Sequence, residues 1–221
     1  MKSKATNRKT PAAEEQTPRQ IDAEGSTAPA KARGRRKNVS REDWLYAGLL
    51  QFAEGGESQV RVERIARELG VTKGSYYWYF ASREDFLEQL LQHSLIVGTE
   101  EFIELSETRQ SPREKLRLLI AAILKDRRGK DFQFFLRDFA RRNKLAAKIL
   151  RQTEGRRIAY VTGLLRESGL DSLEAAARAE IFYNYYLGWY ERNKDRPLNR
   201  KELERQLDWM ARIVGVSLAD D

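Results

Sequence analysis

Five consecutive aromatic residues, Tyr76 to Phe80, constrain this chain more than any other stretch. Helical residues advance by about 100° each, so five side chains in a row circle the helix axis and cannot all be buried. If Tyr76 points into a core, Phe80 lies beside it one turn later. A surface of small and aromatic side chains is then left exposed, which favours contact with another molecule. Its members are Gly74, Ser75, Tyr77 and Trp78.

The sequence around this run predicts three consecutive helices. A first helix begins near Ser40, and a second, short helix spans 62–69 with apolar residues on one face. Gly70 breaks the chain, and Thr72 is expected to cap a third helix that ends at Phe80. A strand is the alternative for the aromatic run, but no second strand lies nearby to pair with it. Two short helices joined by a glycine-containing turn and braced by a preceding helix are typical of a helix-turn-helix.

Helical signals continue to the C-terminus and predict an all-α fold. Ser82 and Asp85 form an expected capping box at the start of a long helix. Further helices are expected after Ser111, over 144–167, and in the remaining stretches up to the C-terminus, and Gly155 is expected to kink or break one of them. The chain therefore reads as an N-terminal three-helix domain followed by a larger helical domain.

The positive charge is concentrated in the first 38 residues. The formal net charge is +8, and residues 1–38 hold ten basic and four acidic side chains. Apart from Met1, Ile21 is their one large apolar residue. This is too little to offset the entropy of ordering, so we expect a disordered basic arm. Such an arm suits phosphate or minor-groove contacts on DNA, although a solvated linker or solubilising tail fits equally. Its basic cluster contains Arg33, Arg35 and Arg36.

The chain lacks the residues that several classes of function require. The chain has no cysteine and a single histidine, His93, so neither a cysteine-based metal site nor a catalytic triad is expected. It contains no phosphate-binding glycine loop and no HExxH or GxSxG motif. No apolar run approaches the ~18 residues of a membrane span, and the N-terminus has no secretory signal. We therefore expect a protein of the cell interior that is not an enzyme and needs no metal or cofactor.

A dense motif follows the first predicted helix. It consists of Ile65, Ala66, Leu69, Gly70, Val71, Thr72, Lys73, Gly74, Ser75, Tyr77, Tyr79, Phe80, Ser82, Arg83, Glu84, Asp85, Phe86 and Leu87. This pattern resembles the tetracycline-repressor (TetR) family of bacterial regulators. The likeness covers about 40–91, and beyond that it is one of architecture. It implies that the third helix is a recognition helix that enters the major groove of DNA.

The resemblance also implies which residues touch DNA. Base contacts are implied for Lys73 and Ser75, base or phosphate contacts for Thr72 and Tyr77, and phosphate contacts for Tyr79 and Arg83. The remaining members of the implied interface are Gly74 and Trp78, together with Arg33, Arg35 and Arg36 of the arm. Tyr76 and Phe80 should be core; the alternative is an aromatic helix packed wholly inside a helical domain. Two departures stand out, because the family commonly has Leu or Phe at position 76 and a basic residue at the position of Ala81.

The likeness further implies how the chain is divided and assembled. We expect the disordered arm at 1–38, a helix-turn-helix DNA-binding domain at 39–85, and a helical effector-binding and dimerisation domain at 86–221. A homodimer would read a palindromic double-stranded operator with two recognition helices about one DNA turn apart, roughly 34–36 Å. The last two helices suggest the dimer face, although their aromatic residues would also fit a pocket wall. The predicted interface consists of Ala175, Ala179, Phe182, Tyr186, Leu203, Leu207, Met210 and Val214.

A small-molecule effector is the remaining implication of the family. Its predicted site is lined by Leu95, Phe102, Leu119, Ile123, Phe135, Phe139 and Tyr160, each of which fits plain core as well. The resulting hypothesis is a sequence-specific repressor of the bacterial cytoplasm, associated with the nucleoid when bound to DNA and released from its operator by the effector. The alternatives are a regulator of the same fold without a small-molecule ligand, and a helical module whose aromatic surface binds another protein.

Overall fold

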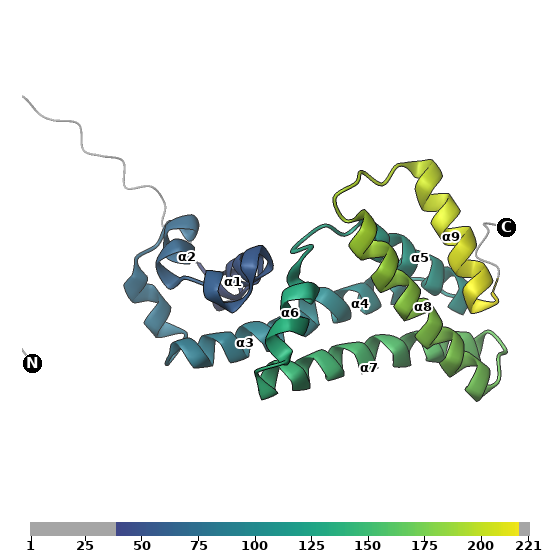
Figure 1. Ribbon diagram of the computed structural model, residues 1–221, viewed down its shortest axis with the longest axis horizontal. Helices are drawn as coiled ribbons and strands as arrows, with labels where there is room; N and C mark the ends of the chain where they lie inside the picture. The colour runs from purple at the N-terminus through teal and green to yellow at the C-terminus, as the bar shows by residue number, and fades with distance from the viewer. Residues whose placement is uncertain (1–38, 217–221) are drawn as a thin grey trace, which may run out of the picture. The chain divides into compact units, whose positions relative to one another are not determined.

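The computed structural model describes residues 39–216, so the predicted arm with Arg33, Arg35 and Arg36 lies outside the described residues. The described part is helical, as predicted, and contains no strand (Figure 1). Its α-helices are α1 (Arg41–Gly55), α2 (Val62–Leu69), α3 (Arg83–Leu95), α4 (Glu101–Glu107), α5 (Pro112–Lys125), α6 (Phe132–Ala140), α7 (Lys144–Glu167), α8 (Ser172–Asn193) and α9 (Arg200–Val214). Between them lie two 3-10 helices, η1 (Glu57–Gln59) and η2 (Lys73–Trp78), and a π-helical segment, η3 (Ile96–Glu100).

Side-chain caps fix where the main helices begin. At α1, Ser40 Oγ accepts from the backbone N–H of Asp43 at 3.1 Å, and the Asp43 carboxylate accepts from the N–H of Ser40 at 2.8 Å. Ser111 and Glu114 form the same reciprocal box at α5, and the Asn199 side chain caps α9. These bonds satisfy N–H groups that no helix carbonyl reaches. The starts of α1 and α5 therefore agree with the sequence prediction.

Two predicted local features are wrong. The Asp85 carboxylate accepts from the N–H of Ala81 at 2.8 Å, so Ser82 caps α3 without the reciprocal half of a capping box. Gly155 neither kinks nor breaks α7, which continues for 24 residues. A single glycine costs an exposed helix only about 1 kcal/mol, which the flanking turns and the packing of α7 outweigh.

The first hydrophobic core joins α1, α2, η2 and α3 to α6 and the start of α7. Gly48 allows α1 and α3 to approach closely, because an added Cβ would lie 2.6 Å from Leu90 Cδ1 and 2.8 Å from Phe86 Cζ. From α6, the ring of Phe132 packs against that of Phe52 with 5.0 Å between centroids. This core therefore continues across the boundary predicted between the two domains.

The second core lies among α5, α7, α8 and α9, and Figure 1 shows α9 beside α5 and α8. It contains seven of the eight residues predicted for the dimer interface. They are Ala175, Ala179, Phe182, Leu203, Leu207, Met210 and Val214. The eighth, Tyr186, packs against the same core. Side chains that their own chain already covers offer no surface to a second copy, so this residue set is wrong as an interface.

One long helical element links the two cores. The chain runs without a loop from Arg83 to Glu107, through α3, η3 and α4. Its first part packs against α1, its last part against α5, and η3 contacts α7 (Figure 1). The π-helical segment inserts a wider turn at the point where the element passes from one core to the other.

Candidate nucleic-acid interface and ligand cavity

The aromatic run folds as the short 3-10 helix η2, whereas the sequence predicts an α-helix up to Phe80. It follows α2 through Gly70, whose φ of 71° lies in the left-handed region that favours glycine. Thr72 holds the N-cap position but makes no side-chain capping bond; instead, Ser75 Oγ donates to the carbonyl of Thr72 at 2.7 Å. The predicted capping role of Thr72 is therefore wrong. A helix of about three residues per turn still distributes the rings around its axis, so partial burial follows as before.

Two residues of the run anchor it to the first core, as predicted. Tyr76 is 2% exposed and Phe80 is 1% exposed. The ring of Tyr76 meets Trp44 edge-on at 5.6 Å and Phe86 at 5.5 Å between centroids. Its hydroxyl donates to the carbonyl of Ser82 at 3.0 Å, which gives the unusual tyrosine a polar partner inside the core. Burial raises the pKa of Tyr76 to about 12.

The opposite side of η2 is a solvent-facing aromatic surface. Trp78 is 84% exposed and Tyr77 is 61% exposed. Single exposed apolar residues are ordinary, but two adjacent large rings beside small residues form a patch suited to contact. The other exposed residues of the predicted interface are Thr72, Lys73, Gly74 and Arg83, while Ser75 and Tyr79 are half-buried.

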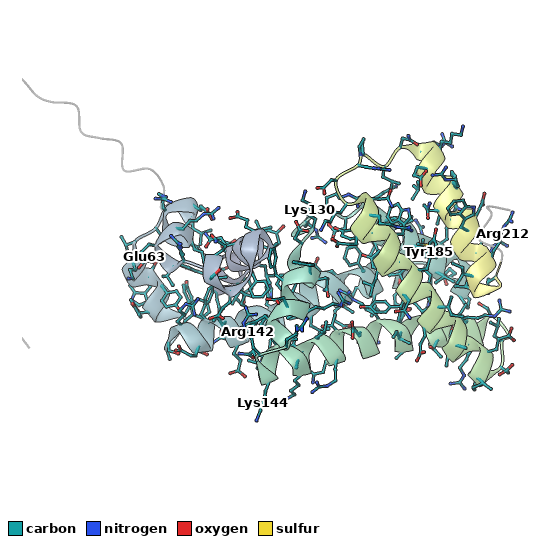
Figure 2. All side chains as sticks on the ribbon, in the orientation of Figure 1. Glu63, Lys130, Arg142, Lys144, Tyr185 and Arg212 are labelled. Carbon is teal, nitrogen blue, oxygen red and sulfur yellow. The ribbon has the colours of Figure 1, made fainter. Side chains whose placement is uncertain are left out.

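Both basic side chains of this surface are held by acids of neighbouring elements. Lys73 Nζ lies 2.5 Å from Oε1 of Glu63, a residue of α2 that is labelled in Figure 2. Arg83 Nη1 lies 2.8 Å from Glu57 Oε1, and its Nη2 donates to the backbone carbonyl of Glu57 at 3.0 Å. The hydrogen bond to Glu63 raises the pKa of Lys73. Exposed ion pairs contribute little to stability, so a phosphate can take the place of either carboxylate at small cost.

Tyr79 has a structural contact that the sequence did not reveal. Its hydroxyl donates to the backbone carbonyl of Val39 at 2.9 Å, and its ring packs against the first core. A phosphate contact by this hydroxyl would therefore share it with the bond to Val39. This bond ties Val39, the first described residue, to the residue that follows η2.

Gly74 meets no steric constraint from its own chain. An added Cβ would touch only Thr72 Oγ1, at the ordinary contact distance of 3.7 Å. Its φ does not lie in the left-handed region, so the backbone does not require glycine either. Neither packing within the described residues nor backbone strain therefore requires glycine at this position.

A cavity of about 140 Å³ lies between the two cores, bounded by α1, α3, η3, α4, α5, α6, α7 and α8. Its wall is mostly aliphatic and aromatic. Four predicted ligand-site residues line it, namely Phe102, Leu119, Ile123 and Tyr160. Leu95, Phe135 and Phe139 do not, and those three predictions are wrong. Phe135 and Phe139 pack against the first core.

Several residues of the cavity wall escaped the sequence prediction. Helix α1 supplies Tyr46, Leu49 and Leu50, so the cavity reaches the helix that braces η2. Tyr186, predicted for the dimer face, lines this cavity instead, and Tyr190 lies beside it. Burial raises the pKa of Tyr186 and raises the pKa of Tyr190 to about 12. Other missed residues include Val97, Gly98, Thr99, Arg157 and Tyr183. They come from elements far apart in the sequence, so no local pattern marks them.

Within residues 39–216, no group of three or more metal-binding side chains comes together, and His93 is half-buried on α3. None of the helices described is long and apolar enough to cross a membrane. The described residues thus combine two features. The exposed segment η2 follows a tight turn and packs against α1 and α3, and a cavity lies on another side of α1. This defines a helix-turn-helix DNA-binding domain joined to a helical domain that encloses a pocket.

Residues 45–90 match the sequence profile of bacterial regulatory proteins of the tetR family. This stretch is therefore similar to the DNA-binding domain of tetR-family regulators. The fatty acid metabolism regulator protein of Bacillus subtilis (strain 168) is 35% identical over 77 residues, which cover 35% of this chain. That alignment spans only 40% of the relative's own length.

Solved structures share the fold along most of the chain. A transcriptional regulator from Rhodococcus sp. Rha1 superposes with a TM-score of 0.64 at 20% identity, covering 81% of this chain and 98% of its own. The regulator FadR from Bacillus subtilis, in complex with stearoyl-CoA, has a TM-score of 0.58 at 21% identity. It is covered over its whole length, and 82% of this chain is covered. At these identities the likeness shows a common fold.

Proposed function

We propose that this protein is a homodimeric, sequence-specific DNA-binding transcriptional regulator, not an enzyme, that represses its target genes until a small-molecule effector binds. The observation that carries the proposal is the exposed surface of η2, with Trp78 and Tyr77 outward and Tyr76 and Phe80 locked in the core. A protein with this surface would act in the bacterial cytoplasm, at the nucleoid when bound to DNA.

On DNA, Lys73, Ser75 and Tyr77 are proposed to reach base edges, with Thr72 and Trp78 beside them and Gly74 at the point of closest approach. Lys73 would exchange Glu63 for an acceptor on a guanine, and Arg83 would exchange Glu57 for a phosphate. The proposed arm with Arg33, Arg35 and Arg36 would add phosphate contacts.

The proposed dimer face is the outer side of α8 with part of α9. Leu173 is 83% exposed and Ile181 is 57% exposed, and Ala177 and Gly188 share that side of α8 at helical spacing. Trp209 of α9 is also exposed, and Figure 2 shows the two helices side by side. Exposed apolar residues gathered on one face of the domain indicate an association surface. Two such faces related by a two-fold axis would form a closed dimer.

The effector is proposed to occupy the cavity between the cores. Because α1 and the α3–η3–α4 element both form its wall, a ligand there touches the two elements that carry η2. Binding would shift the spacing or orientation of the two recognition segments of the dimer, which lowers affinity for an operator of fixed half-site spacing. The stearoyl-CoA in the FadR complex makes molecules with apolar chains the first class to test.

The decisive experiment is a gel-shift titration of the full chain against the DNA upstream of its own gene, followed by selection from random DNA. A sequence-preferring, salt-dependent shift is expected. If neither experiment yields a preferred sequence, the regulator is rejected in favour of a helical module whose aromatic surface binds another protein. If DNA binds but no compound affects it, a regulator of this fold without a small-molecule ligand remains.

A further inference from the structure

Arg157 differs from the other basic residues in the cavity wall because it has no acidic partner. Its Nε donates to Thr99 Oγ1 at 2.9 Å and its Nη2 donates to the carbonyl of Gly98 at 2.8 Å. Within residues 39–216, no carboxylate lies within ion-pair distance of its guanidinium. By contrast, Arg128 pairs with acids at 3.0 and 3.3 Å, and Lys130, labelled in Figure 2, pairs with an acid too.

The acids near Arg157 are engaged elsewhere. Glu100 accepts from Arg156 at 2.9 and 3.0 Å, and Glu154 accepts from Arg137 at 2.7 Å. A guanidinium has five donors, and only two of those on Arg157 are used in these bonds. A half-buried positive charge against an apolar wall, with donors to spare and no counterion, favours an incoming anion.

The two acceptors that Arg157 now uses both belong to η3. Gly98 and Thr99 lie in this π-helical segment, and a Cβ at position 98 would come 3.3 Å from Arg157 Nη2, so the glycine gives the guanidinium room. Wider turns of this type are frequent at functional sites. The two bonds of Arg157 therefore tie α7 to η3, the segment that connects α3 to α4. Helix α3 in turn packs in the same core as η2.

We propose that the cavity binds an apolar carboxylate, whose charged group is held by Arg157 in place of Thr99 and Gly98. This rests on the proposed function and names the class of its effector. The cavity offers about ten times the volume that one water needs, which suits a chain of roughly ten non-hydrogen atoms. When the carboxylate takes the guanidinium, η3 loses its tie to α7 and the α3–η3–α4 element is freed to move.

The first test uses octanoate and 1-octanol, probes of equal chain length that differ in charge, in calorimetric titrations of the full chain. Octanoate is expected to bind at least roughly tenfold more tightly than octanol, since a charge-assisted bond is gained. Arg157→Gln should abolish that preference. Arg151→Gln, which removes an exposed charge of α7 outside the cavity, is the matched control and should retain it. Equal binding of the two probes by the wild-type chain, or no binding of octanoate, overturns the proposal.

A second variant keeps the proposal testable if Arg157→Gln does not fold. Thr99→Val removes one competitor for the guanidinium at nearly constant volume, so octanoate affinity should rise roughly fivefold. If Arg157 and Thr99 only brace the fold, the same change would weaken binding or leave it unaltered, and the carboxylate site is then rejected.

DNA binding by the unliganded chain separates this proposal from the proposed function. Octanoate binding without any DNA binding would reject the regulator and retain the site. DNA binding without octanoate binding would reject the site alone. If both hold, octanoate should weaken operator binding by the wild-type chain and by Arg151→Gln, but not by Arg157→Gln.

Discussion

Replacing Gly74 with alanine should separate the stability of η2 from its contact with DNA. Within the chain the new Cβ would touch only Thr72 Oγ1, at 3.7 Å, and the backbone φ is not strained. Removing glycine from a helix stabilises it by about 0.5–1 kcal/mol. For a chain of this size, 1 kcal/mol raises Tm by about 2–4 °C. Thermal unfolding of Gly74→Ala should therefore occur at a slightly higher temperature than that of the wild-type chain.

The same methyl group should weaken DNA binding, because the contact surface has no room for it. Filling a close contact costs typically about 1–3 kcal/mol, which is at least roughly a fivefold rise in Kd. Fluorescence anisotropy with a labelled operator measures this directly. Gly155→Ala is the matched control, since Gly155 also lies in a helix with open space around it and far from η2. Undiminished operator affinity in Gly74→Ala would falsify the close approach of this backbone to DNA.

Four further changes test the remaining assignments. Tyr77→Ala should weaken specific binding by more than about 1 kcal/mol and leave the dimer intact, whereas unchanged affinity would move the base contacts elsewhere. Ile181→Asp should give folded monomers in size-exclusion chromatography with light scattering, and a persisting dimer would reject the outer face of α8. Leu207→Asp should instead unfold the chain, seen as loss of helical circular dichroism, because it buries an unpaired charge. Deleting residues 1–37 should flatten the slope of log affinity against log salt by about 0.9 per lost phosphate contact, and an unaltered slope would make the arm a bystander.

Local sequence signals predicted most helices and the DNA-binding domain, although they missed the 3-10 form of η2 and misplaced the cap at Thr72. Capping residues such as Ser40, Ser111 and Asn199 act on backbone groups within three residues, so they mark helix starts without tertiary information. The spacing of Tyr76 and Phe80 determined which rings are buried, because a helix cannot hide five in a row. The family motif is likewise local, and the match of residues 45–90 to the tetR-family profile confirms it.

The partner of each apolar helix face is known only from the tertiary packing. The stripe through Leu207 and Met210 has the periodicity of an interface, but periodicity does not say whether the partner is another helix of the same chain or a second copy. The cavity depends on the packing of eight elements, and Arg157 stands out only when its acid neighbours are seen to be paired with other residues. The ion pair of Lys73 with Glu63 likewise joins α2 to η2 through space. Burial and ion pairing depend on how the whole chain packs. For that reason local sequence signals predict the helices, whereas the buried faces and the ion-pair partners are known only from the tertiary structure.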